Sequence, residues 1–395
     1  MKDRQPGYGT KRRLYRLLWL PLVLASMQVQ ASDWFNLYPE NERYWKLVRG
    51  NDASQLTILP RSTGTSTPFQ VAVLFSKKSS AYDIAMNQLL REFENSSVST
   101  DFLLVNYEGN EQKGLNFLEN VRRNGWSRYD LFLSMGSGTT EFLYRNIKGR
   151  PIPVVTICSK DPVLMGQMDN YMRGSGNNFA FTSLDIPINI HLKYMRKLRP
   201  QLKRIVILYA RNNKSARITQ VQPLLNLADK EGIEVIEVVV EDASRAGSEI
   251  VEKLKKAVQY VFAKDATARE SVIWITGSTS VFNEMATINQ LAQKIPVLSV
   301  TPSLVTGNDD SALMSIGVSF KSNAQLAFQY VLPVLEKKDD PGNLSVGQLF
   351  PPDIAIDFSK ARRNGIKIPF SFFETASTIF DYDGRKVKEH GRKLN

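Results

Sequence analysis

The residues best suited to hold a small molecule follow Leu131–Met135, an apolar run typical of a buried strand. The chain continues with the segment 136–140, which reads Gly-Ser-Gly-Thr-Thr. At the start of a helix, its hydroxyls and backbone N–H groups would bind a carboxylate or another anion. A tight turn with a Ser or Thr N-cap is the alternative, and the sequence is compatible with both. The third glycine of a dinucleotide-binding fingerprint is missing.

Other polar residues also follow predicted strands. Asp161 comes after Ile152–Ile157 and precedes a proline, so it is either an ordinary turn residue or a ligand contact. Tyr82 would stack on a flat ligand, although an aromatic ring in the first turn of a helix more often packs in the core. The complete set of predicted ligand-binding residues is Ser76, Tyr82, Ser137, Gly138, Thr139, Thr140, Asp161, Asn212, Gly277, Ser278, Thr279, Thr301 and Ser303.

The elements that position these residues alternate between strands and helices. Continuous runs rich in β-branched residues, separated by amphipathic stretches, indicate parallel sheets covered on both faces. The predicted strands are Phe69–Phe75, Phe102–Asn106, Leu131–Met135, Ile152–Ile157, Arg204–Tyr209, Ile233–Val240, Val272–Thr276 and Pro296–Val300. The predicted helices are Tyr82–Glu94, Thr139–Ile147, Ile186–Leu198, Ala216–Glu231, Gly247–Phe262 and Val281–Lys294.

The pattern restarts after a polar, glycine-rich interval at 174–178. We therefore predict an α/β fold with two doubly wound lobes and a cleft between the carboxyl ends of their strands. The expected first lobe comprises 68–182 and about 302–322. The expected second lobe comprises 183–301 and about 323–376. Residues 32–67 are expected to be an aromatic-rich extension and linker, and 377–395 a solvated basic tail.

An enzyme is disfavoured by the scarcity of catalytic residue types. The chain has two histidines. His191 is expected to be a half-exposed structural residue, and His390 lies in the basic tail, so neither suits a Ser-His-Asp triad. Cys158, the single cysteine, is expected to be a buried thiol at a strand end. No His/Cys cluster suggests a metal site, and no pattern suggests nucleic-acid binding. We predict a monomer without cofactor or metal.

The N-terminus resembles a secretory signal. Basic residues at Lys11–Arg16 precede the apolar run Leu17–Leu24, and small residues stand at Val29 and Ala31. An uncleaved anchor is the alternative, but the run is shorter than the ~20 residues of a spanning helix. We expect cleavage after Ala31 and a periplasmic protein. The chain's net charge of +12 includes six basic residues and one acidic residue from 1–31, so the mature chain would carry about +7.

Several segments, in order, resemble the ABC-transporter substrate-binding family that includes the tryptophan-associated binding proteins. The likeness covers roughly residues 69–380. The matching segments are Met135–Thr140, Ile152–Val155, Asp161–Val163, Arg199–Tyr209, Gln220–Gly232, Asp353–Asp357 and Ala361–Pro369.

The resemblance implies the fold of type I periplasmic binding proteins, in which the chain crosses between the lobes three times. We expect these crossings near Asn178–Ile186, Pro302–Ile316 and Phe320–Asn323. It also implies binding of a small solute, hinge closure around it and delivery to a membrane permease. The alternative is a ligand-sensing or scaffold module that acts on a membrane signalling protein.

Three positions depart from the family pattern. Relatives often have Tyr-Asn where this chain has Tyr209 followed by Ala210, and acidic residues of later loops are replaced by Ser278 and Ser303. An α-amino acid needs carboxylate or carbonyl partners for its ammonium group, because an unpartnered buried cation is costly. These loops therefore favour a neutral polar or anionic solute.

Overall fold

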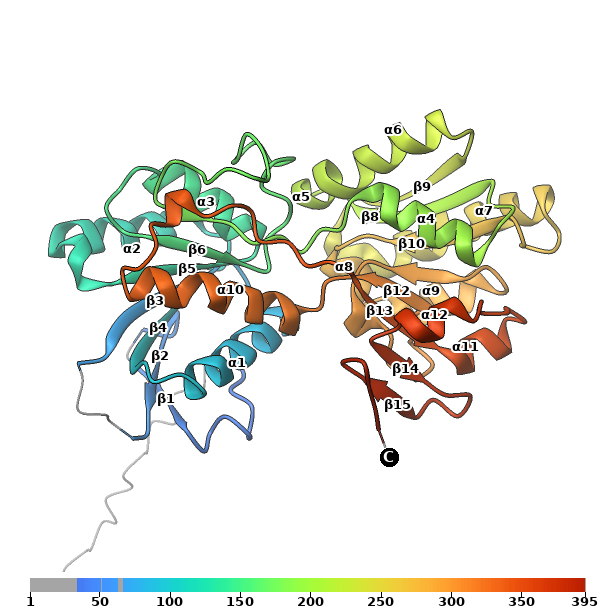
Figure 1. The fold of residues 1–395 in the computed structure, drawn as a ribbon. Coiled ribbons are helices and arrows are strands. Elements are labelled where there is room, and N and C mark those ends of the chain that lie inside the picture. Colours follow the sequence, from blue (N-terminus) through green and yellow to red (C-terminus); the bar gives the residue numbers. More distant parts are fainter. Residues whose placement is uncertain (1–33, 51, 63–66, 395) are drawn as a thin grey trace, which may run out of the picture.

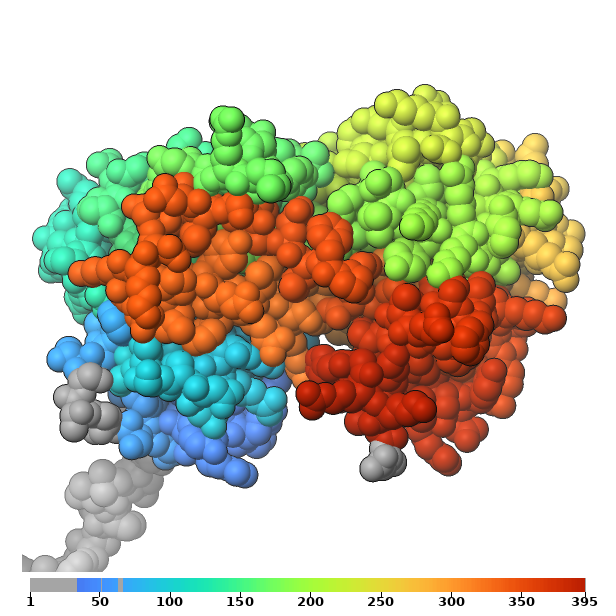
Figure 2. Space-filling model, in the orientation of Figure 1, coloured from blue at the N-terminus to red at the C-terminus, as the bar shows by residue number. Residues whose placement is uncertain are grey.

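The computed structural model describes residues 34–50, 52–62 and 67–394, which form two α/β lobes side by side (Figures 1 and 2). The expected signal segment, 1–31, lies outside the described residues. Each lobe contains one sheet with a mainly parallel centre, and helices cover both faces of each sheet. The predicted fold class is confirmed.

The first lobe is built on a seven-stranded sheet of order β1-β2-β4-β3-β5-β6-β7. Helices α1 (Ser80–Glu94) and α10 (Phe320–Leu335) pack on one face, while α2 (Glu111–Asn124) and α3 (Ser137–Ile147) cover the other. The strands are β1 (Trp45–Arg49), β2 (Gln55–Pro60), β3 (Phe69–Phe75), β4 (Thr100–Asn106), β5 (Leu131–Met135), β6 (Val154–Ile157) and β7 (Phe179–Ala180).

The second lobe is built on a nine-stranded sheet of order β16-β15-β14-β13-β12-β11-β10-β8-β9. Its strands are β8 (Arg204–Ala210), β9 (Glu234–Val240), β10 (Ser271–Ile275), β11 (Val297–Ser299), β12 (Met314–Gly317), β13 (Asp353–Asp357), β14 (Thr378–Phe380), β15 (Lys386–Glu389) and β16 (Arg392–Lys393). Strands β8 to β12 run parallel, and β13 is antiparallel to β12.

Helices on both faces enclose two apolar clusters of the second lobe. The helical segments are α4 (Ile188–Leu198), α5 (Lys214–Ala216), the π-helical turn Arg217–Val221, α6 (Gln222–Lys230), α7 (Ala246–Lys264), α8 (Thr279–Phe282), α9 (Met285–Ala292), α11 (Phe358–Arg363) and α12 (Ser371–Thr375). The strands predicted from apolar runs are all present, with ends shifted by at most two residues. The pattern works because central strands of a covered parallel sheet are apolar on both faces.

The N-terminal extension is part of the first lobe, which corrects the expected linker at 32–67. Strands β1 and β2 join the sheet by antiparallel pairing, with β2 beside β4. Trp34 and Phe35 lie in the apolar core, where the Trp34 ring packs edge-on against Phe75 with centroids 5.4 Å apart. Trp34, Phe35 and Trp45 bury their large apolar rings in this core, whereas Tyr44 remains 44% exposed.

The C-terminal segment is also folded, which corrects the expected solvated tail at 377–395. Strand β14 pairs with β13, and β15 and β16 form a hairpin beside it. Ile379 and Phe380 are buried. The basic residues that suggested a tail lie mostly on the exposed hairpin. Their charge is typical of a solvated segment, so composition did not indicate that this segment forms the edge of a sheet.

The chain crosses between the lobes three times, between β7 and α4, between β12 and α10, and between Asn343 and β13. In Figure 1 the orange helix α10 lies against α1, whereas β12 and β13 lie in the other lobe. The expected division is therefore wrong after residue 301. Residues 302–317 belong with the second lobe, and α10 belongs with the first, because its small side chains Ala324 and Ala327 pack in the first core.

Asn323 lies near the start of α10, where the chain re-enters the first lobe, and its hydrogen bonds hold this helix in place. Its side chain is fully buried, and its Oδ1 accepts a hydrogen bond of 2.7 Å from the backbone N–H of Cys158. Its Nδ2 donates to Thr182 Oγ1 at 3.3 Å and to the Ser183 carbonyl at 3.4 Å. One amide thus connects α10, the end of β6 and the first crossing.

His191 lies in the core of the second lobe rather than half-exposed as expected. It is 2% exposed, and its ring centroid lies 5.3 Å from that of Trp274. Burial lowers the pKa of His191 to about 4, while Asp185 raises it and Lys160 lowers it by smaller amounts. The imidazole is therefore neutral in the folded protein at neutral pH.

Within the described ranges, no helix combines the length and the apolar character that a bilayer span requires.

Replacing Asn323 by Ala should lower the free energy of unfolding by about 2–4 kcal/mol, because the buried Cys158 N–H loses its acceptor. Urea denaturation measures this change. Gln325→Ala, an exposed position on the same helix, should change it by less than about 0.5 kcal/mol. Equal effects of the two variants would contradict the assigned role of Asn323.

Stability should fall in acid because of His191. The unfolded chain binds a proton at His191 as the pH falls below the ordinary value of 6.5, whereas the folded chain does so only near pH 4. The stability present above pH 6.5 should therefore decrease by about 1.4 kcal/mol at pH 5.5 and about 3 kcal/mol at pH 4. His191→Leu should remove this part of the pH dependence in denaturation curves. His390→Asn, at an exposed position, should leave it unchanged.

Candidate functional site

A cleft of about 950 Å³ lies between the two lobes. The loops that follow β3, β5 and β6 line it from the first lobe, and those that follow β8, β10 and β11 line it from the second. The carboxyl ends of both sets of parallel strands thus face one space. Open α/β sheets bind ligands at this edge because loops and helix N-termini converge there.

Most predicted ligand-binding residues line this cleft. From the first lobe the lining includes Ser76, Tyr82, Ser137 and Gly138. From the second lobe it includes Asn212, Gly277, Ser278, Thr279, Thr301 and Ser303.

Thr139 and Thr140 do not line the cleft. Both are fully buried against the sheet, and Thr140 Oγ1 lies 2.8 Å from Ser134 Oγ and donates to the Gly136 carbonyl at 3.2 Å. Successive helix residues point about 100° apart, so the first two residues of α3 face the cleft and the next two face inward. In this segment Ser137 and Gly138 form part of the cleft wall, whereas the hydroxyls of Thr139 and Thr140 are buried within the lobe.

Asp161 is a turn residue, which corrects its place among the ligand contacts. Its Oδ1 accepts hydrogen bonds from the backbone N–H groups of Val163 at 2.8 Å and Leu164 at 3.0 Å. Its Oδ2 accepts from the Tyr171 hydroxyl at 2.7 Å. Burial raises the pKa of Asp161, and the Tyr171 hydrogen bond opposes that shift. Asp before Pro thus organises its own loop.

Tyr82 forms part of the cleft wall while packing against Phe75, with centroids 6.1 Å apart. Its exposed fraction is 9%, and burial raises the pKa of its hydroxyl. The hydroxyl lies against Gly136, where an added Cβ would approach it to 2.0 Å. Gly136 also has a φ of +85°, so both space and backbone conformation require glycine there.

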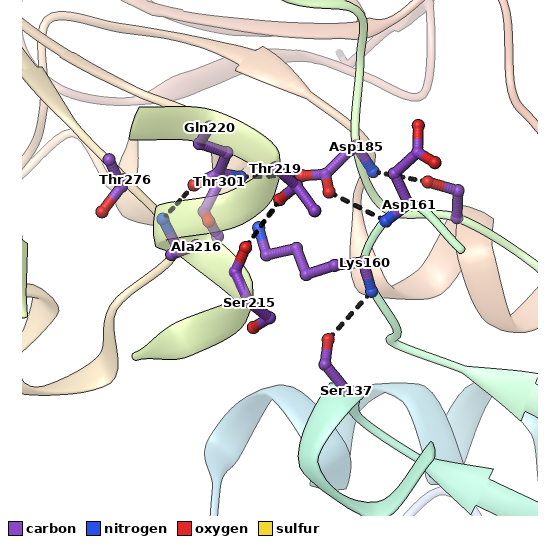
Figure 3. Close-up of polar contacts among 12 residues, drawn as sticks. Ser137, Lys160, Asp161, Asp185, Ser215, Ala216, Thr219, Gln220, Thr276 and Thr301 are labelled. Atoms are coloured by element: carbon purple, nitrogen blue, oxygen red, sulfur yellow. Dashed lines mark hydrogen bonds and ion pairs between the residues drawn. The ribbon is translucent and has the colours of Figure 1, made fainter. Parts of the chain in front are cut away.

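A buried polar network, which sequence reasoning missed, connects residues of both lobes beside the cleft (Figure 3). Lys160 Nζ lies 3.1 Å from Asp185 Oδ1, and Gln220 Nε2 donates to the same oxygen at 2.8 Å. Gln220 Oε1 in turn accepts a hydrogen bond of 2.9 Å from the Gly277 backbone N–H. Lys160 belongs to the first lobe, Asp185 to the first crossing, and Gln220 and Gly277 to the second lobe.

The network stabilises the charged form of Asp185. Burial raises its pKa, but the Lys160 ammonium and hydrogen bonds from Asp161 N–H, Thr219 and Gln220 outweigh burial, so the pKa lies below its usual value. At Gly277, an added Cβ would approach Lys160 Nζ to 2.6 Å. A side chain at this position would displace the Lys160 ammonium from its place beside Asp185.

Two further contacts bridge the lobes at the cleft rim. Lys77 Nζ donates to Thr279 Oγ1 at 3.2 Å, and Lys214 Nζ lies 2.6 Å from Glu141 Oε1. All four of these residues line the cleft. Because these pairs are largely exposed, each contributes little to stability.

The cleft also contains charged residues that the sequence did not single out. Lys77, Glu141, Lys160, Lys214 and Glu284 are part of its lining. The sequence contains one weak indication that Lys160 lies at the cleft, because this residue directly precedes Asp161 in the loop after a predicted strand. No local pattern marked Asp185 or Gln220, because their role depends on contacts between distant segments.

The chemistry of the cleft suits binding rather than bond cleavage. Hydroxyl and amide groups dominate its polar lining, and His191 is buried in the core and is not part of that lining. Cys158 borders the cleft but is 5% exposed, and burial raises the pKa of its thiol. Among the described residues, no cluster of three or more His, Cys, Asp or Glu side chains is arranged for a metal ion.

Solved structures with the same architecture cover most of the chain. A Streptococcus pneumonia ABC domain in complex with L-Trp has 18% identity and a TM-score of 0.61, over 78% of this chain and 99% of that one. A conserved domain protein from Vibrio cholerae has 22% identity and a TM-score of 0.62, over 79% and 100%. The ligand-free, open structure of a Clostridium difficile substrate binding protein with adhesive properties has 15% identity and a TM-score of 0.58, over 78% and 98%.

These identities support the fold alone, which is that of type I periplasmic binding proteins. No curated protein matches the chain. The model of a family described as ABC transporter substrate binding protein matches residues 71–379, which include both lobes and the loops that line the cleft. The chain therefore belongs to the ABC transporter substrate-binding protein family, whose members bind solutes and are not enzymes.

Proposed function

We propose that this protein is the periplasmic solute-binding component of an ABC-type importer and that it captures a small polar solute by closing its lobes. The observation that supports this most directly is the cleft, whose walls come from the strand ends of both lobes. A ligand held between two walls stabilises the closed arrangement by contacting both at once. A permease that recognises the closed form would then receive loaded protein.

The lining supports a polar solute recognised mainly by hydroxyl, amide and backbone groups. Ser76 and Ser137 line the cleft from the first lobe, and Ser278 and Ser303 line it from the second. Asp185 beside the cleft is paired with Lys160, and Glu141 in the lining with Lys214. Glu284 also lines the cleft and has no ion pair among the described residues, but three lysines, Lys77, Lys160 and Lys214, line the same space. An incoming ammonium group would have to compete with these lysines. We therefore expect a neutral polar or anionic solute.

A thermal-shift screen of the exported chain against amino acids, nucleobases, polyols and small anions tests solute binding. At a concentration one hundred times its Kd, a true ligand should stabilise the protein by about 2.7 kcal/mol, which raises Tm by about 3–4 °C for a chain of this length. Ser76→Ala and Ser303→Ala, one on each wall, should each weaken binding about fivefold through loss of one hydrogen bond. Ser127→Ala, an exposed serine outside the cleft, is the matched control.

Stabilisation by none of these compounds would contradict solute capture. A hit confined to α-amino acids would leave capture intact and overturn the expected chemistry of the ligand. Cells that lack the protein should also lose uptake of the hit. Unchanged uptake, with binding in vitro retained, would favour the sensing or scaffold role over import.

Lobe closure is tested at Gln220. Gln220→Met keeps the approximate side-chain volume but removes the bonds to Asp185 and Gly277, so the equilibrium should shift toward open forms by about tenfold. Small-angle scattering should then show a larger radius of gyration without solute and recovery with it. Gln222→Met, at an exposed position two residues away, should match the wild type. An unchanged radius in both variants would contradict the role of the network in closure.

A further inference from the structure

An aromatic–basic face lies on the second lobe, outside the cleft. Its exposed rings are Phe370, Phe373 and Tyr382, which are 75%, 37% and 54% exposed. They come from α12, the loop before it, and the turn between β14 and β15. Residues from 358 onward, shown in red in Figure 2, form a continuous part of the surface of this lobe.

The rings of this face are held in one arrangement. Phe373 stacks on both sides, with its centroid 4.5 Å from that of Phe358 and 6.0 Å from that of Phe370. Tyr382 packs edge-on against Phe358 at 5.7 Å. The exposed rings are therefore anchored through the buried Phe358. A fixed apolar patch of this kind indicates a contact surface rather than scattered exposure.

Cationic side chains lie beside the rings. The Arg362 guanidinium sits 5.7 Å from the centroid of Tyr382 and donates to its carbonyl at 2.9 Å. Lys388 Nζ donates to the Phe373 carbonyl at 3.2 Å. From Phe358 to Lys393 the chain has nine Lys or Arg residues and four Asp or Glu residues. The segment therefore carries a net positive charge. Arg363, Arg385 and Lys386 are ion-paired with carboxylates. Arg362 and Lys388 supply the positive charge beside the exposed rings.

We propose that the aromatic–basic face docks the protein onto an anionic phospholipid surface. Aromatic rings enter the boundary between head groups and acyl chains, while Lys and Arg remain at head-group level and bind phosphate. This face offers exposed rings that can enter the boundary region and, beside them, cations that can remain at the head groups. A protein partner would need an acidic and an apolar surface side by side to match this face, whereas an anionic bilayer supplies both along its whole surface. Docking would hold the protein near the membrane without occupying its cleft.

Vesicle sedimentation of the exported chain tests this proposal. The protein should bind vesicles of equal parts phosphatidylcholine and phosphatidylglycerol, bind less at high salt, and not bind phosphatidylcholine alone. The Phe370→Ser/Phe373→Ser double variant should lower the partition coefficient about tenfold. Arg362→Gln and Lys388→Gln should each lower it about fivefold.

Tyr44→Ser, at an exposed ring of the first lobe, and Lys294→Gln, at an exposed cation far from the face in sequence, are the matched controls. Both should bind vesicles like the wild type. Thermal shifts with the solute should be the same in all variants, which separates this test from that of the cleft. Absent vesicle binding, or equal binding by the face variants and the controls, would overturn the proposal. Loss of binding to a detergent-solubilised permease, without any vesicle binding, would assign the face to an acidic protein partner instead.

Discussion

The buried ion pair between Lys160 and Asp185, extended by Gln220, is a polar link between the two lobes. Both side chains are at least nine-tenths buried, and removing charges from water is costly unless each charge finds close partners. Asp185 meets this requirement with Lys160, Gln220 and the Asp161 N–H, which together come from both lobes and the first crossing. The lobes can separate at this point only if these polar groups find other partners, such as water.

The position of this network connects packing with function. Two of its members, Lys160 and Gly277, also line the cleft. Gly277 leaves room for Lys160 and donates its backbone N–H to Gln220. Ser137 Oγ accepts the Lys160 backbone N–H at 2.9 Å, so the wall of the cleft and the network share one loop. A solute that contacts Ser137 or the Gly277 loop would therefore influence the same contacts that hold the lobes together.

The first wall of the cleft depends on the N-terminal extension. Asn36 donates to Asp83 through its backbone N–H at 3.3 Å and its side chain at 3.1 Å, and the Tyr38 N–H donates to Asn87 at 2.8 Å. These bonds fix the first turns of α1, which carry Tyr82 at the cleft. The extension is thus a structural support for the wall and not an appended linker.

The sequence by itself determined the class of the fold and the edge of each sheet that lines the cleft. Runs such as Phe69–Phe75 and Arg204–Ala210 are apolar throughout because both faces of a central parallel strand are covered. Ser76, Ser137 and Ser278 were found because residues at the carboxyl ends of such strands meet in one cleft. Only the tertiary structure decided which lobe receives α10, that the basic C-terminal segment closes a sheet, and that Asp185 joins Lys160 to Gln220. The physical reason is that periodicity records the environment of a residue within its own element, whereas these features arise from contacts between segments far apart in the chain.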